Sequence, residues 1–309
     1  MKVVFMGTPE FAVPSLEAIH GSSHELAAVV TVSDKPIGRG LKVQPSPVKK
    51  AALNYGVPIF QPDDLLNQNF IKELFEIEAD LFVVVAFRIL PVEVFRIPPF
   101  GTINLHASLL PKYRGAAPIN WAIINGETET GLSTIFIQER VDAGDLILQK
   151  RVEIGSDETA GELHDRLAIA GADLLLETID QIADGTAIAR QQVGEFTKAP
   201  KLIKELMRIY WSESAEKIRN LIRGLSPTPG AFSTLNGRMV KLLRAQAIEA
   251  SGQDEPGRII LVDIKSGRIV VACESGALAI NELQMEGKRP MSSKEYLIGH
   301  ALNVGEKFS

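Results

Sequence analysis

Three polar side chains in the middle of the chain have the types that chemistry at a carbonyl carbon needs. Asn104 and His106 alternate with the apolar residues Ile103 and Leu105, so in an extended strand both polar side chains point to the same face. Asp142 follows in the turn VDAGD. An amide and a protonated imidazole can stabilise an oxyanion, and a carboxylate can keep the imidazole charged or assist proton removal from an attacking amine. The set predicts group transfer to a nucleophile through a tetrahedral intermediate.

The segment after His106 predicts a stiff loop beside this pair. The loop has the sequence SLLP and consists of Ser108, Leu109, Leu110 and Pro111. Pro118 then lies in the first turn of a predicted helix, where the missing N–H is harmless. We expect a strand end that presents two side chains and a loop that exposes backbone donors, as at the ligand-binding edge of an open α/β sheet. Taken alone, each polar residue admits a structural role, and the combination with this loop favours catalysis.

Strands and helices alternate through residues 1–188 and predict a doubly wound, mostly parallel α/β domain. Predicted strands cover 2–6, 26–32, 57–60, 80–87 and 101–106, with helices near 7–20 and 65–77. A pair of strands follows at 131–138 and 145–152. Thr159 and Glu162 then form a capping box at the start of a helix that Gly185 ends.

The pattern changes after residue 188. Residues 189–207 lose the periodicity and are predicted to be a linker. Within 208–309, Asn236 and Gly237 separate two apolar segments and predict a hairpin with a type I′ turn. Three more short strands are predicted at 259–264, 268–273 and 277–283, and a final helix is capped by Ser292 and Glu295. Five short strands with a helix favour a small β-barrel of oligonucleotide-binding (OB) type.

Composition narrows the class of protein further. The 309 residues suffice for two domains, and 45% hydrophobic with 23% charged residues is ordinary for a globular protein. The only cysteine, Cys273, excludes a disulfide within the chain. The first residues lack the order of a signal peptide and no apolar run is long enough to span a membrane, so we expect a cytoplasmic protein.

Several familiar active-site motifs are absent from the sequence. GxGxxG does not follow the first strand, and neither GxxxxGK[ST] nor GxSxG occurs, which disfavours dinucleotide enzymes, P-loop proteins and α/β-hydrolases. The five histidines have no zinc-like spacing with cysteine. Asp142 and Asp145 are the one pair that could bind a hard cation, and the Ala-Gly between them is more typical of a turn. We therefore expect no metal.

Charged residues are distributed unevenly along the chain. Residues 1–188 carry 15 Lys and Arg against 25 Asp and Glu, a net −10, whereas 189–309 carry 18 against 13, a net +5. A basic second half could be the footprint of a polyanion or simply a solvated surface. Residues 33–50 are an exception in the first half, with five basic residues and one acid among three prolines and two glycines. A loop of this length is either functional or a solvated insertion.

The sequence resembles the methionyl-tRNA formyltransferase family over nearly its whole length. The matching segments are FMGTPEFA at the start, GRG and PSPVK within 38–49, VVVA at 83–86, INLHASLLPKYRGAAPI at 103–119, NGE and TG within 125–131, VDAGD at 141–145, and LLR and GKRPMS in the last third. The resemblance implies 10-formyltetrahydrofolate as formyl donor and the α-amino group of methionine on initiator tRNA as acceptor.

The resemblance also implies roles for single residues and domains. Asn104, His106 and Asp142 match the catalytic positions of the family, and the SLLP loop (108–111) matches its tetrahydrofolate-binding loop. Arg39 lies in the tRNA-recognition loop. Residues 1–188 would form a Rossmann-like catalytic domain and 208–309 an OB-like domain that binds tRNA, in a protein expected to be a monomer.

Three departures from the family pattern leave the Asn, His and Asp set intact. The run VVVAFRILP differs at Phe87 and Arg88, which would alter the wall of the folate pocket. Arg140 replaces a glycine before the aspartate turn, so it must adopt or reshape the backbone conformation there. Leu206 and Tyr210 replace residues that are usually acidic.

Two alternative functions stay open. A formyltransferase acting on a small amine, such as an amino sugar nucleotide or a ribonucleotide amine, would use the same folate chemistry with another acceptor. A non-catalytic tRNA- or folate-binding protein could keep the fold, although the complete Asn, His and Asp set argues against it.

Overall fold

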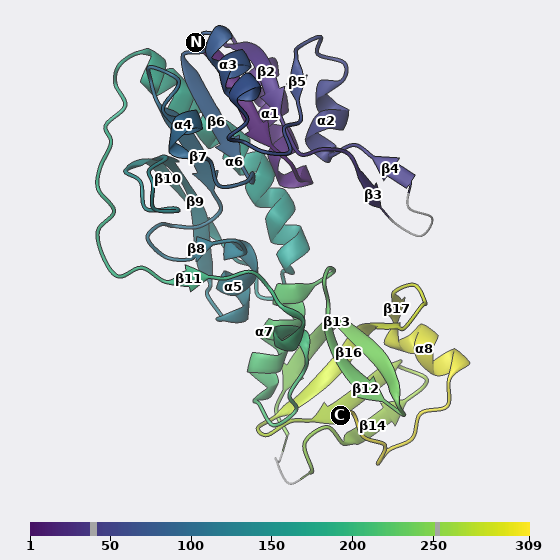
Figure 1. Cartoon of the computed structure of the whole chain (residues 1–309). Helices are drawn as coiled ribbons and strands as arrows, with labels where there is room; N and C mark the ends of the chain where they lie inside the picture. Colours follow the sequence, from purple (N-terminus) through teal and green to yellow (C-terminus); the bar gives the residue numbers. More distant parts are fainter. Residues whose placement is uncertain (38–41, 251–253) are drawn as a thin grey trace. The chain divides into compact units, whose positions relative to one another are not determined.

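The computed structural model describes residues 1–37, 42–250 and 254–309, so Arg39 lies outside the described residues (Figure 1). The chain divides into two compact units. The first consists of 1–116, 130–153 and 164–199, and the second of 117–129, 154–163 and 200–309. Within the described part of the chain, no helix is long and apolar enough to cross a membrane.

The first unit is built on a seven-stranded sheet with the order β10-β9-β7-β6-β1-β2-β5. Its parallel strands are β1 (Lys2–Gly7), β2 (Glu25–Val30), β5 (Ile59–Phe60), β6 (Leu81–Val85) and β7 (Thr102–His106). β9 (Glu129–Phe136) runs antiparallel to β7, and β10 (Leu146–Glu153) is the edge strand. After β1, the chain adds β2 and then β5 on one side of it, and then adds β6 and β7 on the other side. The predicted parallel α/β core is confirmed. The order in which successive strands are added reverses between β1 and β6, and sheets of this kind bind ligands at such a point.

Helices cover both faces of this sheet (Figure 1). α3 (Gln68–Glu76) and α4 (Val92–Phe95) pack on the face formed by alternate strand residues; the buried cluster there includes Val4, Met6, Val30, Phe70, Leu74, Phe82, Val84 and Val94. α6 (Ala160–Ala183) packs on the opposite face, where a Cβ on Gly171 would lie 2.7 Å from the Leu105 side chain. Because Asn104 and His106 alternate with Leu105, they point to the α3 and α4 side of the sheet.

The first unit contains more regular structure near its N-terminal end than the sequence predicted. η1 (Glu10–Ala12) and α1 (Val13–His20) follow β1 as expected. Residues 33–50 are not a loop throughout: β3 (Lys35–Ile37) and β4 (Lys42–Gln44) pair antiparallel, and α2 (Pro47–Ala52) follows them. Ser46 accepts a bond from the Lys49 N–H and caps α2, with proline in the first turn.

The second unit contains a six-stranded antiparallel sheet. Its path is β12 (Ala231–Leu235), β13 (Arg238–Ile248), β16 (Ala277–Met285), β15 (Arg268–Ala272) and β14 (Ile259–Asp263), with β17 (Met291–Ser292) on β16. Asn236 and Gly237 have φ of 50° and 74°, which confirms the predicted hairpin turn. Its helices are α5 (Pro118–Ile124), α7 (Ala215–Leu225) and α8 (Ser293–Gly299).

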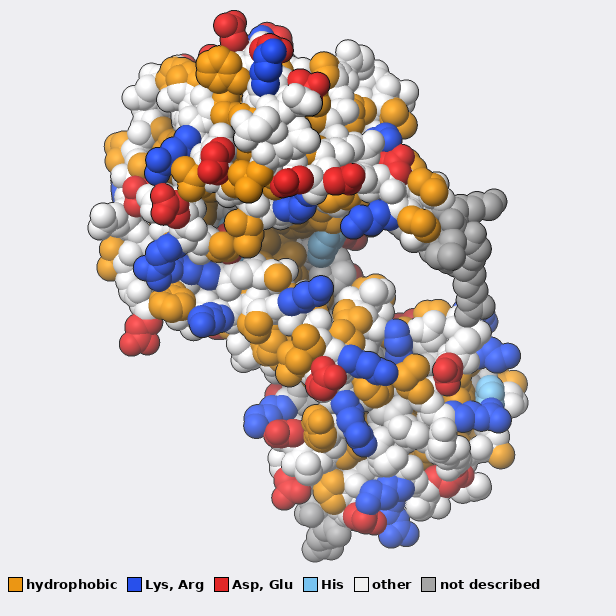
Figure 2. Space-filling view, viewed as in Figure 1, with side chains coloured by type: hydrophobic (Ala, Val, Ile, Leu, Met, Phe, Trp, Pro, Cys, Tyr) orange, Lys and Arg blue, Asp and Glu red, His pale blue; other side chains and the backbone are white. Residues whose placement is uncertain are grey.

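A buried cluster joins the sheet of the second unit to its helices. Trp211, Ile222 and Leu242 belong to this core, and the Trp211 indole donates to the Ser233 hydroxyl at 3.0 Å. α5 packs closely on α7, where a Cβ on Gly224 would lie 2.5 Å from Ile124. On the face of this unit in Figure 2, lysine and arginine side chains lie among acidic and apolar ones.

Candidate active site

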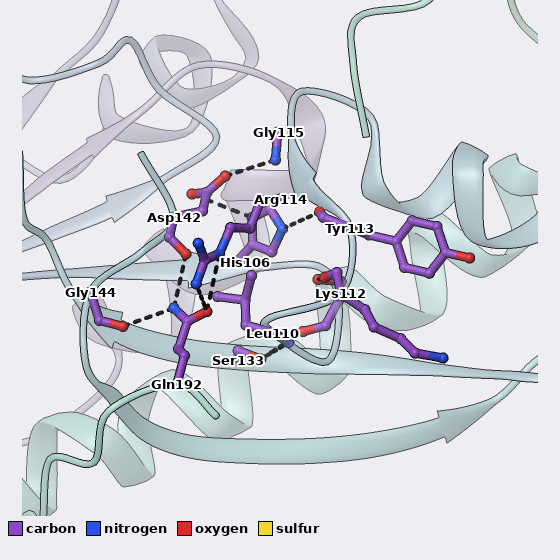
Figure 3. Close-up of polar contacts among 11 residues, drawn as sticks. His106, Leu110, Lys112, Tyr113, Arg114, Gly115, Ser133, Asp142, Gly144 and Gln192 are labelled. Atoms are coloured by element: carbon purple, nitrogen blue, oxygen red, sulfur yellow. Dashed lines mark hydrogen bonds and ion pairs between the residues drawn. The ribbon is translucent and has the colours of Figure 1, made fainter. Parts of the chain in front are cut away.

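His106 is the last residue of β7 and lies between two acceptors (Figure 3). Its Nε2 is 2.9 Å from the carbonyl oxygen of Tyr113, and since a carbonyl only accepts, Nε2 carries the proton of that bond. Its Nδ1 faces Asp142 Oδ1 at 3.7 Å, an ion-pair distance beyond hydrogen-bond range. The side chains are 7% and 12% exposed, so the pair is largely screened from water.

Asp142 is held in an unusual backbone conformation. Its φ is 52°, in the left-handed region that non-glycine residues rarely adopt. The carboxylate Oδ2 accepts the backbone N–H of Gly115 at 2.9 Å. Two residues later, a Cβ on Gly144 would lie 1.6 Å from the carbonyl oxygen of Phe136. The predicted turn is therefore built around Asp142 and Gly144. Arg140, in contrast, is not among the residues with positive φ.

Asn104 is half-buried two residues before His106 on β7. The structure brings His106 and Asp142 together and places Asn104 on the same face of the same strand. Among the described residues, no hydrogen bond is formed by the Asn104 amide. The amide is thus available to a carbonyl oxygen, whereas both nitrogens of His106 already face protein acceptors.

The SLLP loop is tied to the sheet by two polar residues that the sequence analysis missed. Ser133 Oγ donates to the Ser108 carbonyl at 2.6 Å and accepts the Leu110 N–H at 3.1 Å. Gln149 Nε2 donates to the Leu110 carbonyl at 3.0 Å and to Ser133 Oγ at 2.9 Å. The expectation that this loop exposes its backbone donors is therefore wrong at Leu110. Ser133 is opposite His106 in the β7–β9 register, a pairing that only the topology reveals.

The Ser108 and Leu109 side chains differ in surroundings. Ser108 is fully buried, and its hydroxyl donates to the Lys112 carbonyl at 2.6 Å. Leu109 is partly exposed, and a Cβ on Gly131 would lie 2.5 Å from its side chain. Because Gly131 has no side chain, the Leu109 side chain can occupy this space.

Gln192 joins three segments at the edge of the site (Figure 3). Its Nε2 donates to the carbonyls of Asp142 and Gly144, both at 2.8 Å. Its Oε1 accepts Nε and Nη2 of Arg114 at 3.2 and 2.6 Å. The sequence analysis placed Gln192 in a linker, and no local pattern marks it.

Arg114 lies on β8 (Arg114–Gly115), which pairs with β11 (Lys198–Ala199). Burial lowers the pKa of Arg114, the charge of Arg140 acts in the same direction, and Asp142 opposes them. The Arg114 guanidinium also lies 5.2 Å from the centre of the Phe196 ring. Residues after α6 therefore contribute directly to the surroundings of Asp142.

The departure at Phe87 and Arg88 has a definite structure. Ala86, just after β6, has a φ of 48°. The Arg88 guanidinium donates to the carbonyls of Pro62 and Asp63 at 2.7 and 2.9 Å and lies 5.2 Å from the Phe87 ring centre. Arg88 thus fastens the end of β6 to the loop before α3. The other two positions, Leu206 and Tyr210, are exposed.

Metal ligands do not gather at the site in the portion of the chain that the structure describes. There, no three His, Cys, Asp or Glu side chains are close enough together to hold a metal ion.

Comparisons with known proteins identify the family of this chain. Residues 1–179 match the family described as formyl transferase, and residues 201–301 match the formyl transferase C-terminal domain. The chain belongs to the formyl transferase family. The resemblance inferred from the motifs is thereby confirmed, and the match covers both the α/β unit and most of the second unit.

Relatives within the family extend the match over the whole chain. A methionyl-tRNA formyltransferase of Alkaliphilus oremlandii is 49% identical over 99% of this chain and 98% of its own length. That of Caldanaerobacter subterraneus is 46% identical over 99% of each. The crystal structure of an N-formyltransferase from Helicobacter canadensis, in complex with folinic acid and dTDP-3-aminofucose, aligns with a TM-score of 0.67 over 92% of this chain and 99% of its own. At 20% identity, this last likeness shows the fold.

Proposed function

We propose that this enzyme transfers the formyl group of 10-formyltetrahydrofolate to the α-amino group of methionine on charged initiator tRNA. The observation that carries the proposal is 49% identity, over 99% of the chain, to a methionyl-tRNA formyltransferase. The pairing of His106 and Asp142 at the carboxyl end of β7 supports it, because this arrangement suits acyl transfer to an amine.

Asn104, His106 and Asp142 are the proposed catalytic residues. The Asn104 amide donates to the formyl oxygen as the methionyl nitrogen forms its bond to the formyl carbon and negative charge develops on that oxygen. His106 adds a second donor, for which its Nε2 proton must be shared with the Tyr113 carbonyl or leave it. Asp142 stabilises the charged imidazole and assists removal of a proton from the attacking amine. Collapse of the tetrahedral intermediate breaks the bond to the folate nitrogen, which takes up a proton.

Ser108, Leu109, Leu110 and Pro111 are proposed to bind the folate. Ser133 and Gln149 fix the backbone of this loop, so its shape is set before a ligand arrives. The partly exposed Leu109 offers apolar surface, and the half-buried Asn104 leaves its amide to the donor's carbonyl. These features support binding of the folate by this loop, beside the proposed site of formyl transfer.

The remaining assignments concern the acceptor and the domains. We propose that Arg39 contacts the tRNA and that 1–188 is the catalytic domain. Residues 189–207 serve as the linker and 208–309 as an OB-like tRNA-binding barrel, for which the family match of 201–301 and the antiparallel sheet are the support. The protein is proposed to act as a cytoplasmic monomer.

A comparison of acceptors tests this function. Purified protein and 10-formyltetrahydrofolate are incubated in parallel with methionyl-initiator tRNA, with a charged elongator tRNA and with a nucleotide-linked amino sugar. Formylation of the initiator tRNA at the highest kcat/KM is expected. A higher kcat/KM on the amino sugar would replace the tRNA reaction with the small-amine alternative.

A further inference from the structure

The carboxylate of Asp142 depends on a backbone conformation that needs support from outside its own turn. A left-handed φ at a non-glycine residue costs about 1–3 kcal/mol and persists only where surrounding contacts determine it. Asp142 has such a φ, 52°. Its Oδ2 bond to the Gly115 N–H fixes the side chain. The main chain of the turn is bonded by Gln192, through the carbonyls of Asp142 and Gly144.

Gln192 can make these bonds in one orientation only. Its NH₂ group faces two carbonyl oxygens, and its Oε1 faces two N–H groups of Arg114. A rotation of the amide by 180° would set oxygen against carbonyls and NH₂ against the guanidinium, so every bond would become a repulsion. All four contacts together therefore specify an amide, and neither an apolar nor an acidic side chain of the same length reproduces them.

We propose that Gln192 is a positioning residue for the reaction, acting through Asp142. Its amide fixes the turn that carries the carboxylate, and it links that turn to Arg114 and to the segment that follows α6. The inference rests on the proposed function, in which Asp142 assists the transfer. Release of the turn lets the carboxylate leave its place opposite His106 Nδ1, where the distance is already 3.7 Å.

Two variants distinguish the bonds made by the NH₂ group of Gln192 from those made by its oxygen. Gln192→Leu removes all four bonds at nearly constant size. Gln192→Glu keeps an acceptor for Arg114 but sets carboxylate oxygen against the carbonyls of Asp142 and Gly144. The matched control is Gln191→Leu, because Gln191 is exposed and adjacent. Each full-length variant is assayed at a temperature where circular dichroism shows it folded.

The expected result is a kcat at least about tenfold lower in both Gln192 variants, since a displacement of 1 Å can cost about 10²-fold. KM for methionyl-tRNA should stay near the wild-type value, and Gln191→Leu should match the wild type. Hydrogen exchange of the Gly115 amide, which bonds Asp142 Oδ2, should become faster in both Gln192 variants and not in the control.

Three results would overturn the inference. A wild-type kcat in Gln192→Glu would mean that only the Arg114 contact matters. A lower melting temperature with unchanged kcat in both variants would assign Gln192 a purely structural role, and unchanged protection of the Gly115 amide would show that Asp142 is held without it. If the wild-type protein fails to formylate methionyl-tRNA, the proposed function is wrong, and Gly115 exchange alone then decides whether Gln192 holds Asp142.

Discussion

At the scale of the residue, the site is a histidine whose two nitrogens are both engaged by oxygen. The Tyr113 carbonyl accepts from Nε2, and Asp142 faces Nδ1. This arrangement fixes the ring plane, because each nitrogen faces an oxygen acceptor. The fixed orientation of the ring suits the preorganised stabilisation of an oxyanion that we propose for His106.

Substitution of the three proposed catalytic residues should lower kcat far more than donor affinity. Asn104→Ala and His106→Ala each remove a donor to the oxyanion, and loss of one such donor costs about 10²–10³ in kcat. Asp142→Asn removes the charge opposite His106 and should also lower kcat. Steady-state kinetics with charged initiator tRNA, beside folate binding measured by calorimetry, checks this. A variant that turns over at the wild-type rate would remove its residue from the catalytic set.

The sequence predicted the proposed reacting groups but not the residues that hold them. Asn104, His106 and Asp142 were found because their chemical types are scarce in apolar segments. Ser133, Gln149 and Gln192 lie 23 or more residues from the groups that they bond in the SLLP loop and the Asp142 turn. Ser133 and Gln149 also bond each other, across 16 residues. Contacts of this kind depend on strand order and register, which periodicity does not encode.

At the scale of the element, local signals were the most dependable. The capping box of Thr159 and Glu162 is present, with reciprocal bonds of 2.9 and 3.3 Å at the start of α6. The hairpin turn at residues 236–237 also formed as its residue types dictate. The segment 33–50 was harder, because three prolines and two glycines suggested a loop, whereas strand pairing across it and the Ser46 cap produce β3, β4 and α2.

The turn from β9 to Asp142 provides an element-scale prediction. Gly144→Ala should lower kcat by about 10–10²-fold, because its Cβ would lie 1.6 Å from the Phe136 carbonyl oxygen and the turn would have to move. The fall in kcat is measured with methionyl-tRNA. Gly299→Ala is the control, since its Cβ would meet nothing within 4 Å. Wild-type kinetics in Gly144→Ala would show that the turn can shift without affecting the site.

The cap of α8 provides a prediction for pH. The Ser292 N–H, the Arg289 guanidinium and the Ser292 hydroxyl lower the pKa of Glu295 to about 2 from 4.5. A depressed folded-state pKa contributes stability that is complete above about 4.5 and is lost as pH falls towards 2. Glu295→Gln should therefore lower the urea midpoint of the second unit more at pH 6 than at pH 3.

Tryptophan fluorescence measures this transition, because Trp121 and Trp211 both lie in the second unit. Glu286→Gln, at an exposed position of the same unit, is the control for loss of a negative charge. An equal effect of Glu295→Gln at the two pH values would contradict the proposed origin of the shift.

At the scale of the whole molecule, the basic second half carries less free positive charge than its composition suggests. Five candidates for phosphate contact follow from the sequence: Arg219, Arg223, Lys241, Arg244 and Lys288. Four of them are engaged within the unit. Arg219 and Arg244 pair with Asp157 and Glu162, Arg223 is 8% exposed and donates to the Gly155 carbonyl, and Lys241 donates to the Pro229 carbonyl. Burial lowers the pKa of Arg223, and Arg219 adds to this. These four therefore already have partners within the unit.

Lys288 is the exposed candidate, on the loop between β16 and β17, and among the described residues its ammonium makes no ion pair or hydrogen bond. Lys288→Ala should raise KM for methionyl-tRNA and reduce the slope of log KM against log salt by about 1, as loss of one phosphate contact does. Lys217→Ala is the control, because Lys217 is already paired with Glu213 at 2.9 Å. The measurement is KM at several salt concentrations for the three full-length proteins. If log KM rises steeply with log salt and Lys288→Ala leaves that slope unchanged, other lysines and arginines make the phosphate contacts. A KM independent of salt in the wild type would mean that no phosphate is bound, and would favour a small amine as the acceptor.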